Sequence, residues 1–429
     1  MICDNLSVKN GHLYFAGRDT TELAARYGTP LYLMDEERLR RNCRVYREAM
    51  GRSFASALPL YASKALACRR VYEIIAEEGL GADVVSAGEL YLARSAAFPM
   101  DKVFFHGNSK TDEEISFAMD CGVGYFIIDN ADELAAVERI AAEKGIRQKA
   151  LLRLTPGIDP HTFAAVSTGQ VDSKFGVPIE TGQALTFVRQ ALEMSHIHLR
   201  GIHAHVGSQV FTSQVFYDTA DIMLRFMAEL RDKLGYTAEI LNLGGGYGVR
   251  YTQSDPVVDI AQEVGKVAEH VKAGCAALGL PEPMVLMEPG RSIVADAGLT
   301  LYTVQSTKTI PGYRSYVSVD GGMTDNPRYA LYHASYTIEP AGRMDDERDF
   351  VCTVGGRCCE SGDMIQEDVA LPRLQRGDLL AVLTTGAYNH SMASNYNTVA
   401  RPPIVMLSGG QDYVAVRRET FADLAAREL

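Results

Sequence analysis

Eight short apolar runs alternate with helical segments between residues 57 and 290, and this pattern restricts the fold more than any other feature of the sequence. Strands that alternate with helices form parallel sheets. The intervening segments have the apolar spacing of amphipathic helices, as in VYEIIAEEG (71–79). Eight parallel strands with seven intervening helices predict an α/β fold, the (β/α)8 barrel. The runs are ALPLYAS (57–63), ADVVS (82–86), KVFFH (102–106), GYFII (124–128), KALLRL (149–154), RGIHAH (200–205), EILNL (239–243) and MVLME (284–288).

An open doubly wound sheet is the alternative architecture, because its strands and helices alternate in the same way. Its dinucleotide-binding members carry the fingerprint G-x-G-x-x-G after a strand. The run GGGYGV (244–249) has Val249 where the third glycine would stand. This mismatch favours the barrel.

After Glu288 the pattern changes to alternating strand-like runs without long helical segments. These runs predict a second, all-β domain. The first 30 residues, with HLYFAG (12–17) and the helix-like TELAARYG (21–28), are too short to fold alone, and we expect them to add a strand to it. We therefore assign residues 31–296 to the barrel and residues 1–30 plus 297–429 to the β domain. The four runs are LTLYTVQSTK (299–308), YVSVD (316–320), DFVCTV (349–354) and LLAVLTT (379–385).

Charge and cysteine content exclude several classes of function. The net charge of -12 disfavours nucleic acid or an anionic membrane as a partner. The N-terminal MICDNLSVKN has neither the charged nor the apolar region of a signal peptide, so we expect a cytoplasmic protein. The eight cysteines have irregular spacing, which indicates neither a disulfide framework nor a zinc site. A disulfide between the adjacent Cys358 and Cys359 would close a strained ring.

The residues that follow the predicted strands include several with reactive or charged side chains. Barrel enzymes have their active sites at the rim formed by the carboxyl ends of the strands. Lys64 follows the first strand, where an amine can form a Schiff base, although a lysine at a strand end is more often simply solvated. Gly244–Gly246 follow the seventh strand and can approach a phosphate, or serve a tight turn, and Arg291 adds positive charge. Glu288 can pair with a ring nitrogen. A lysine, a phosphate site and such a carboxylate are the groups that pyridoxal 5'-phosphate requires.

Two histidines raise a different possibility. His203 and His205 are two residues apart on one predicted strand and face the same way, as in a His-x-His metal pair. A metal-dependent barrel hydrolase is therefore an alternative function, but His106 is the only other histidine at a strand end. We expect no metal, a core role for His203, and stacking on a cofactor ring for His205.

Ten motifs in order from residue 31 to 400 resemble the diaminopimelate decarboxylases. These are fold-type III pyridoxal-phosphate enzymes, alongside ornithine and arginine decarboxylases and, more distantly, alanine racemase. The resemblance implies a barrel plus a β domain, and it covers nearly the whole chain. The motifs are YASKA, GLGADVVSAGEL, HGNSK, STGQVDSKFG, GIHAHVGSQ, LNLGGGYGVRY, EPGRSIV, VDGGMTDNPRYALY, CCESGD and TGAYNHSMASNYN. Departures from the usual family residues stand at Leu66, Ser109, Thr155, Asn389 and His390.

The same resemblance implies roles for individual residues. Lys64 would hold the cofactor as a Schiff base, His205 would stack on its ring and Glu288 would pair with its ring nitrogen. Phosphate-binding groups would come from Ser208, Gly244, Gly245, Gly246, Gly290 and Arg291. Substrate-binding groups would be Arg291, Arg328 and Tyr332 for the distal carboxylate, Glu360 for its ammonium, and Tyr388, which would also contact the cofactor.

Cys359 is implied to be the proton donor to the α-carbon, and it would come with Glu360 from the opposite subunit of a homodimer. Each active site would then need both chains. The implied reaction is decarboxylation of meso-2,6-diaminopimelate to L-lysine and CO2, the last step of lysine synthesis from diaminopimelate. Decarboxylation of a related amino acid, of the ornithine, arginine or lysine type, is the alternative within the family.

Overall fold

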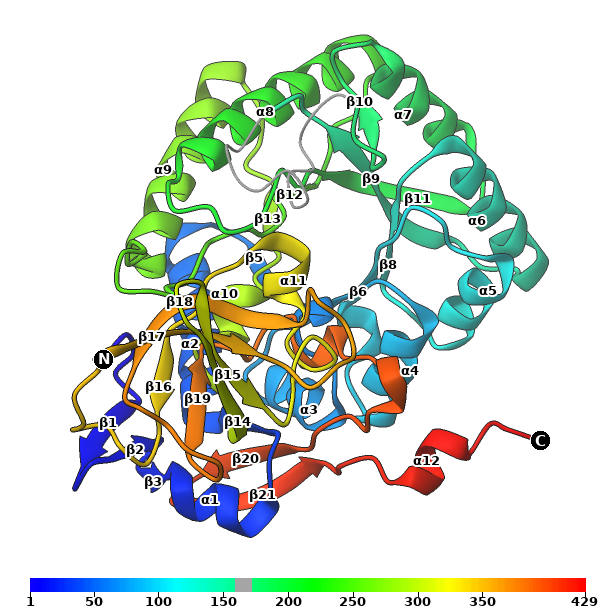
Figure 1. Ribbon diagram of the computed structural model, residues 1–429. Coiled ribbons are helices and arrows are strands. Elements are labelled where there is room, and N and C mark those ends of the chain that lie inside the picture. Colours follow the sequence, from blue (N-terminus) through cyan, green and yellow to red (C-terminus); the bar gives the residue numbers. More distant parts are fainter. Residues whose placement is uncertain (159–171) are drawn as a thin grey trace. The chain divides into compact units, whose positions relative to one another are not determined.

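A computed structural model describes residues 1–158 and 172–429, and the chain packs as two compact units. We call residues 42–248 and 257–290 the barrel unit, and residues 1–41, 249–256 and 291–429 the β unit. Figure 1 follows the chain through both units by colour. Residues 167–171 of the motif STGQVDSKFG lie outside the described part.

The barrel unit contains a closed barrel of eight parallel strands, which confirms the predicted fold class and rules out the open sheet. The order β5-β6-β7-β8-β9-β11-β12-β13 returns to β5, and a short strand β10 (Val177–Pro178) also pairs with β9. The strands are β5 (Ala57–Ala62), β6 (Gly81–Val84), β7 (Val103–Phe105), β8 (Tyr125–Ile128), β9 (Gln148–Thr155), β11 (Ile197–His203), β12 (Ile240–Asn242) and β13 (Met284–Met287).

Seven helices connect the eight barrel strands within the described residues, as the alternation predicted. Local sequence sets their ends: α5 begins at a capping box in which Thr111 and Glu114 bond each other's backbone, and α6 ends at the left-handed Gly145. No helix in residues 1–158 and 172–429 is long and apolar enough to cross a membrane. The helices are α3 (Arg69–Glu77), α4 (Ala87–Ser95), α5 (Asp112–Asp120), α6 (Ala131–Lys144), α7 (Gln183–Glu193), α8 (Gln214–Leu234) and α9 (Ile260–Leu278); α2 (Glu36–Ser53) precedes the first strand.

Strand β11 differs from its prediction at both ends. It begins at Ile197, three residues before the predicted Arg200, and its pairing with β9 shifts register between Leu199 and Gly201. A side chain at Gly201 would stand 2.0 Å from the Ile240 carbonyl oxygen, so the neighbouring strand passes too close for any other residue. The strand ends at His203, and His205 therefore lies beyond it.

The interior of the barrel is filled by one apolar side chain or two from most of its strands. Leu60 lies in this cluster with Leu58 packed against it, because alternate residues of a strand face the same side. The layer positions the polar rim because it fixes the strand ends above it. Its buried members are Leu60, Phe104, Ile127, Leu151, Ile240 and Leu286.

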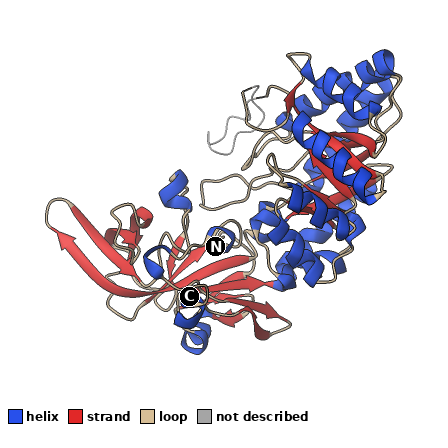
Figure 2. Cartoon of the chain, turned by 90° about the vertical axis from the view of Figure 1, so that its right-hand side faces the viewer, coloured by secondary structure: helices blue, strands red, loops and turns tan. Residues whose placement is uncertain are grey.

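The β unit is built on a second sheet, with the order β18-β17-β15-β14-β4-β20-β21 and with β16 and β19 attached through β14. Figure 2 colours the strands of the chain red and its helices blue. All four predicted strands are present. The strands are β4 (Leu31–Asp35), β14 (Gly298–Ile310), β15 (Arg314–Val319), β16 (Ile338–Pro340), β17 (Phe350–Gly355), β18 (Met364–Leu371), β19 (Leu379–Leu383), β20 (Ile404–Ser408) and β21 (Gln411–Val416); the short helices are α10 (Arg291–Val294), α11 (Arg328–Tyr332) and α12 (Phe421–Ala425).

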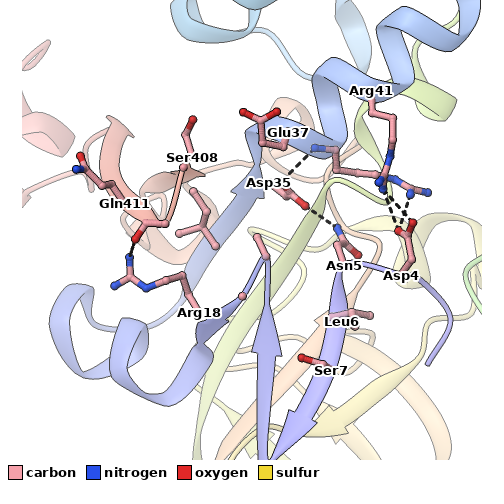
Figure 3. Close-up of a pocket in the computed structure, with 16 residues that line it drawn as sticks. Asp4, Asn5, Leu6, Ser7, Arg18, Asp35, Glu37, Arg41, Ser408 and Gln411 are labelled. Atoms are coloured by element: carbon pink, nitrogen blue, oxygen red, sulfur yellow. Dashed lines mark hydrogen bonds and ion pairs between the residues drawn. The ribbon is translucent and has the colours of Figure 1, made fainter.

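The first 30 residues belong to the β unit but form a small sheet of their own, β1 (Leu6–Lys9), β2 (His12–Phe15) and β3 (Arg18–Asp19), followed by α1 (Thr20–Tyr27). A cleft of about 440 Å³ lies beside this sheet (Figure 3). Its charged groups pair largely with one another: Asp4 accepts from Arg38 Nη1 at 2.6 Å and from Arg41 Nη2 at 3.0 Å. Asn5 Nδ2 donates to Asp35 Oδ2 at 3.2 Å. These pairs fasten the N-terminal segment to the β unit.

Candidate active site

Lys64 lies in a short 3-10 turn, Ser63–Ala65, directly after β5, and its side chain is exposed at the rim of the barrel. The turn is held against the end of the eighth strand, because Ala62 N donates to the Pro289 carbonyl at 3.0 Å. Gly290 completes this contact. A Cβ atom there would stand 3.0 Å from the Ala62 Cβ and 3.2 Å from the Ala65 Cβ, so any other residue would push the two segments apart by a few tenths of an ångström.

Glu288, directly after β13, is buried and bonded through both carboxylate oxygens. Oε1 accepts from Asn242 Nδ2 at 2.6 Å and lies 3.0 Å from His106 Nε2. Oε2 lies at hydrogen-bond distance, 3.3 Å, from His203 Nε2. Burial by itself favours the protonated acid, but His106 and His203 outweigh it and hold the pKa of Glu288 well below its usual value. The carboxylate is therefore ionised.

His205 and the glycine run form one bonded group beside Glu288. Gly245 N donates to His205 Nδ1 at 3.2 Å, and Gly244 N donates to Asn242 Oδ1 at 2.9 Å. Burial, together with the positive charges of Lys64 and Arg153, holds the pKa of His205 well below its usual value. The ring is therefore neutral at physiological pH, the form in which it can accept the Gly245 N–H.

Each of the three glycines is required by the backbone around it. A Cβ atom would stand 2.6 Å from the Ala204 carbonyl oxygen at Gly244, 2.0 Å from that of Glu288 at Gly245 and 2.4 Å from that of Gly207 at Gly246. Gly244 and Gly246 also have positive φ, 68° and 137°. Close packing alone thus accounts for the run, and two of its amides already donate to protein groups. Ser208 lies three residues after His205 on the same rim and is partly buried.

The His-x-His pair does not act as one unit. His203 contacts Glu288, whereas His205 contacts Gly245. Within the described residues, one group of three side chains could share a metal ion, with ligand atoms within 4.8 Å of one another, and it consists of His106, His203 and Glu288. His205 is not part of that group.

In the β unit, Arg291 starts α10 and is surrounded by aromatic rings. Its Nη1 donates to the Tyr251 hydroxyl at 2.6 Å, and its guanidinium carbon lies 4.6 Å from the centre of the Tyr388 ring. Tyr388 has a positive φ of 63°, which is unusual for a bulky residue and indicates that its surroundings fix it. The predicted pair of Arg291 and Tyr388 is therefore in contact.

Arg328 joins the same cluster of tyrosines. It is buried, its Nη1 donates to the Tyr336 hydroxyl at 2.7 Å, and its guanidinium carbon lies 4.5 Å from the centre of the Tyr251 ring. Asn389, one of the departures from the family pattern, donates from Nδ2 to the same hydroxyl at 3.2 Å. Tyr332 ends the short helix that Arg328 begins, and it is partly buried. Tyr251 thus contacts both predicted substrate arginines.

Cys359 and Glu360 lie in the turn between β17 and β18, and both side chains are exposed. Cys359 N donates to Asn397 Oδ1 at 2.7 Å, and Glu360 N donates to the Cys358 carbonyl at 2.8 Å. Cys358 is partly buried, and burial raises the pKa of its thiol to about 11. The two cysteines therefore have different surroundings, although they are adjacent in sequence.

The structure places most of the predicted residues in three groups: Lys64, His205, Ser208, the glycines and Glu288 on the barrel rim; Arg291, Arg328 and Tyr388 in the tyrosine cluster; and Cys359 with Glu360 in the turn. Tyr332 lies at the other end of the short helix that Arg328 begins. Sequence reasoning missed Tyr251, Tyr336 and Asn242. Asn242 could have been noticed as a polar residue at a strand end, as His106 was. Nothing in the sequence marked the two tyrosines, because each is brought to its arginine by tertiary packing.

Comparison with known proteins identifies the family. The family model for the pyridoxal-dependent decarboxylase, pyridoxal binding domain, matches residues 36–295. The chain is 43% identical over 421 residues to the diaminopimelate decarboxylase of Bacillus subtilis, covering 98% of this chain and 96% of that one. It superposes on the crystal structure of diaminopimelate decarboxylase from M. jannaschii in complex with L-lysine with a TM-score of 0.91 and 34% identity, over 99% and 98% of the two chains. For the lysine/ornithine decarboxylase from Vibrio vulnificus complexed with putrescine the values are 0.77 and 26%, over 90% and 97%.

A barrel with a glycine-lined rim and a separate β unit is the architecture of this class, and the chain belongs to the pyridoxal-dependent decarboxylases. It matches diaminopimelate decarboxylases over nearly its full length. The cofactor of the family is pyridoxal phosphate, and the residues present fit it. Glu288 is an ionised carboxylate, the form that could pair with a protonated ring nitrogen, and Lys64 is an exposed amine on the same rim. The alternative function predicted from the two histidines, a metal-dependent barrel hydrolase, is therefore wrong, because the chain belongs to the decarboxylases.

Proposed function

We propose that this protein decarboxylates meso-2,6-diaminopimelate at its D-centre and releases L-lysine and CO2, the last step of lysine synthesis from diaminopimelate. The observation that carries the proposal is the full-length match to diaminopimelate decarboxylases, at 43% identity over 98% of the chain for the Bacillus subtilis enzyme. The structure superposed from M. jannaschii contains L-lysine, the product of this reaction. The match includes the β unit, in which the predicted substrate-binding residues lie.

The barrel, within the predicted domain 31–296, would hold the cofactor. Lys64 would bind it covalently, His205 would lie against its ring, and Ser208, Gly244–Gly246, Gly290 and Arg291 would hold its phosphate. When bound, pyridoxal phosphate supplies an electron sink for the electron pair left behind as CO2 departs. Glu288 would hold the proton on the ring nitrogen, since its low pKa keeps it from taking that proton itself.

The β unit, from the predicted domain 1–30 plus 297–429, would recognise the end of the substrate that does not react. That end is an amino acid group with one carboxylate and one ammonium. Arg291 and Arg328, with Tyr332 and Tyr388, would bind the carboxylate, and Glu360 would bind the ammonium. A guanidinium has five N–H donors, so the bond that Arg328 makes to Tyr336 uses one of them. The Tyr336 hydroxyl therefore orients Arg328 while using only one of its donors.

Cys359 would deliver a proton from its Sγ to the α-carbon after CO2 has left. We propose that Cys359 and Glu360 act in the site of a partner subunit, so that a homodimer is needed for activity. The exposure of both side chains supports this, because a residue that completes a partner's site must be accessible on its own chain.

The test is to purify the protein, add pyridoxal phosphate and measure CO2 and lysine from meso-diaminopimelate. We expect release of both, and borohydride reduction should leave the cofactor on Lys64 in a peptide map. A map without modified Lys64 would contradict the cofactor assignment. Release of CO2 from ornithine or arginine but not from diaminopimelate would support the alternative within the family and overturn the substrate assignment. The predicted cytoplasmic location would be checked by cell fractionation.

A further inference from the structure

The carboxylate of Glu288 is surrounded by three side chains to which the sequence assigned no role in catalysis, and two of them, Asn242 and His203, are at hydrogen-bond geometry. Asn242 and His106 approach Oε1 at 2.6 and 3.0 Å, and His203 approaches Oε2 at 3.3 Å. All are nearly inaccessible: the exposed fraction is 0% for Asn242, 1% for His203 and 4% for His106. A buried carboxylate with contacts on both oxygens has little freedom to rotate.

The side chains around Glu288 come from three different strand ends. His106 follows β7, His203 ends β11 and Asn242 ends β12, so each is attached to a rigid element of the closed barrel. The two imidazole rings meet edge to face, with centroids 5.0 Å apart and planes at 79°. They therefore reach the carboxylate from different directions, which fixes its plane.

From this geometry we infer that His203 and His106 are positioning residues, which hold the Glu288 carboxylate in one orientation for the protonated ring nitrogen of the cofactor. The inference deepens the proposed function and rests on its cofactor assignment. In this inference neither histidine touches the substrate. Each affects cofactor binding only by holding the Glu288 carboxylate in place.

The chemistry of His203 agrees with this role. Burial lowers its pKa to about 4, so the ring is neutral at physiological pH. A neutral imidazole has one N–H, and Nε2 is the nitrogen that faces the carboxylate. Nδ1 is buried without a hydrogen-bond partner among the described residues, which fits an unprotonated nitrogen, because a buried N–H without a partner would cost more. His203 thus donates to Glu288 without cancelling its negative charge.

The experiment compares binding of two ligands to apo-protein. One ligand is pyridoxal phosphate, and the other is its analogue with carbon in place of the ring nitrogen. The variants are His203→Leu, which removes the donor, and His203→Gln, whose amide N–H reaches about as far as Nε2. Dissociation constants are measured by absorbance or fluorescence titration, so the readout does not depend on turnover.

We expect His203→Leu to raise the dissociation constant for pyridoxal phosphate by about 10- to 100-fold, the usual effect of removing a bond to a buried charge. The constant for the carbon analogue should change by no more than about twofold, because Glu288 has no ring N–H to bind there. His203→Gln should recover most of the affinity for pyridoxal phosphate. Equal losses for both ligands would show a merely structural role and overturn the inference, and so would an unchanged affinity for pyridoxal phosphate.

If His203→Leu does not fold, His106→Leu is measured against the same two ligands and decides by the same criteria. Failure of the proposed function is separate from failure of this inference. If the wild-type protein binds pyridoxal phosphate but does not release CO2 from diaminopimelate, only the substrate assignment is wrong. Wild-type protein that does not bind pyridoxal phosphate overturns both.

Discussion

Cys358 and Cys359 are adjacent in sequence but differ in their exposure to solvent, because Cys358 is partly buried and Cys359 is exposed. The backbone N–H of Cys358 donates to the buried Asp363 at 2.6 Å, and its thiol pKa is raised to about 11, first by burial and then by the charge of Asp363. Its thiol is therefore protonated at neutral pH and partly covered. Cys359 is exposed in the same turn. The resemblance assigned the proton donor to Cys359, and this difference in surroundings supports that assignment.

Cys359→Ala should slow CO2 release from diaminopimelate by about 10²- to 10⁴-fold, the range typical of a lost general acid. Cys358→Ala is the matched control, and we expect it to retain most of the wild-type rate. The measurement is the steady-state rate of CO2 release at saturating substrate. Equal losses in the two variants would contradict the assignment of Cys359 as the donor.

Thiol alkylation tests the same contrast without turnover. At pH 8, iodoacetamide should modify Cys359 before Cys358, because the thiolate is the reactive form and the pKa of Cys358 is about 11. The rate at Cys358 should rise as the pH approaches that value. Peptide mapping by mass spectrometry follows both sites. Faster modification of Cys358 at pH 8 would show that its thiol is neither covered nor raised in pKa.

Asp325 makes a second prediction, on stability. It is fully buried, accepts a hydrogen bond from the Tyr302 hydroxyl, and burial raises its pKa to about 7. In the unfolded chain the same acid titrates near 3.8. Between these values the folded state binds a proton that the unfolded state does not, so its contribution to the free energy of unfolding falls as pH rises from about 4 to 7. The full loss is on the order of 4 kcal/mol.

Asp325→Asn replaces this acid by a neutral group of the same shape and should remove the pH-dependent loss. We expect the variant to gain stability relative to wild type between pH 5 and pH 8, by up to about 3 kcal/mol. Urea unfolding at the two pH values measures the difference. A difference between wild type and variant that does not change with pH would contradict the raised pKa of Asp325.

Sequence reasoning at this scale found the residues that stand in motifs or directly after strands, such as Lys64 and Glu288. It did not find the residues that hold them. Tyr251 contacts Arg291 and Arg328, yet it stands in an ordinary loop, and only the packing of the β unit brings the three together. The role of a supporting residue depends on its partner, and a single sequence does not show the pairing.

At the scale of elements, the turn between β17 and β18 is organised by one carboxylate. Asp363 is buried, and its two oxygens accept the backbone N–H groups of Met323 and Cys358, both at 2.6 Å. Cβ atoms at Gly322 and Gly356 would stand 2.4 and 2.3 Å from this carboxylate. Gly356, two residues before Cys358, is therefore needed to make room for Asp363, which fixes the turn that presents Cys359.

Asp363→Asn should loosen this turn, because an amide has one acceptor oxygen and its NH2 group would face a backbone N–H. We expect a loss of about 1–3 kcal/mol in the free energy of unfolding, and a lower rate of CO2 release with the Michaelis constant less affected. Glu347→Gln, at an exposed position of the same unit, is the control. Wild-type stability and rate in Asp363→Asn would show that the turn does not depend on the carboxylate.

The barrel strands were predictable because hydrophobic runs, turn residues and helix caps agree along the chain. All eight predicted runs form strands. The main difference from the prediction is at β11, whose pairing with β9 shifts register between Leu199 and Gly201. The strands of the β unit were harder to predict from the sequence. Strands such as β16 (Ile338–Pro340) and β18 (Met364–Leu371) were missed, since short or half-exposed strands carry weak alternation and are specified by their neighbours in the sheet.

At the scale of the whole molecule, the proposed homodimer makes a prediction that no single chain can satisfy. Lys64→Ala and Cys359→Ala chains should each lose at least about 99% of the wild-type rate. When they are mixed under conditions that exchange subunits, we expect roughly a quarter of wild-type activity, since half of the dimers are mixed and each mixed dimer has one complete site. The measurement is CO2 release, with the mixed dimers verified by differently tagged chains. No recovery in verified mixed dimers would contradict shared sites.

The central place of β4 in the sheet of the β unit has a consequence for the newly made chain. Leu31–Asp35 pairs with β14 on one side and with β20 on the other, and β20 begins only at Ile404. During synthesis on the ribosome, β4 is made before the barrel strands, and its two partner strands are made after them. Both edges of β4 therefore stay unpaired while the barrel is synthesised. Unpaired strand edges promote aggregation. The barrel can therefore fold during translation, whereas the sheet of the β unit is completed only after Ile404–Ser408 has been synthesised. A chaperone would protect the chain in this interval.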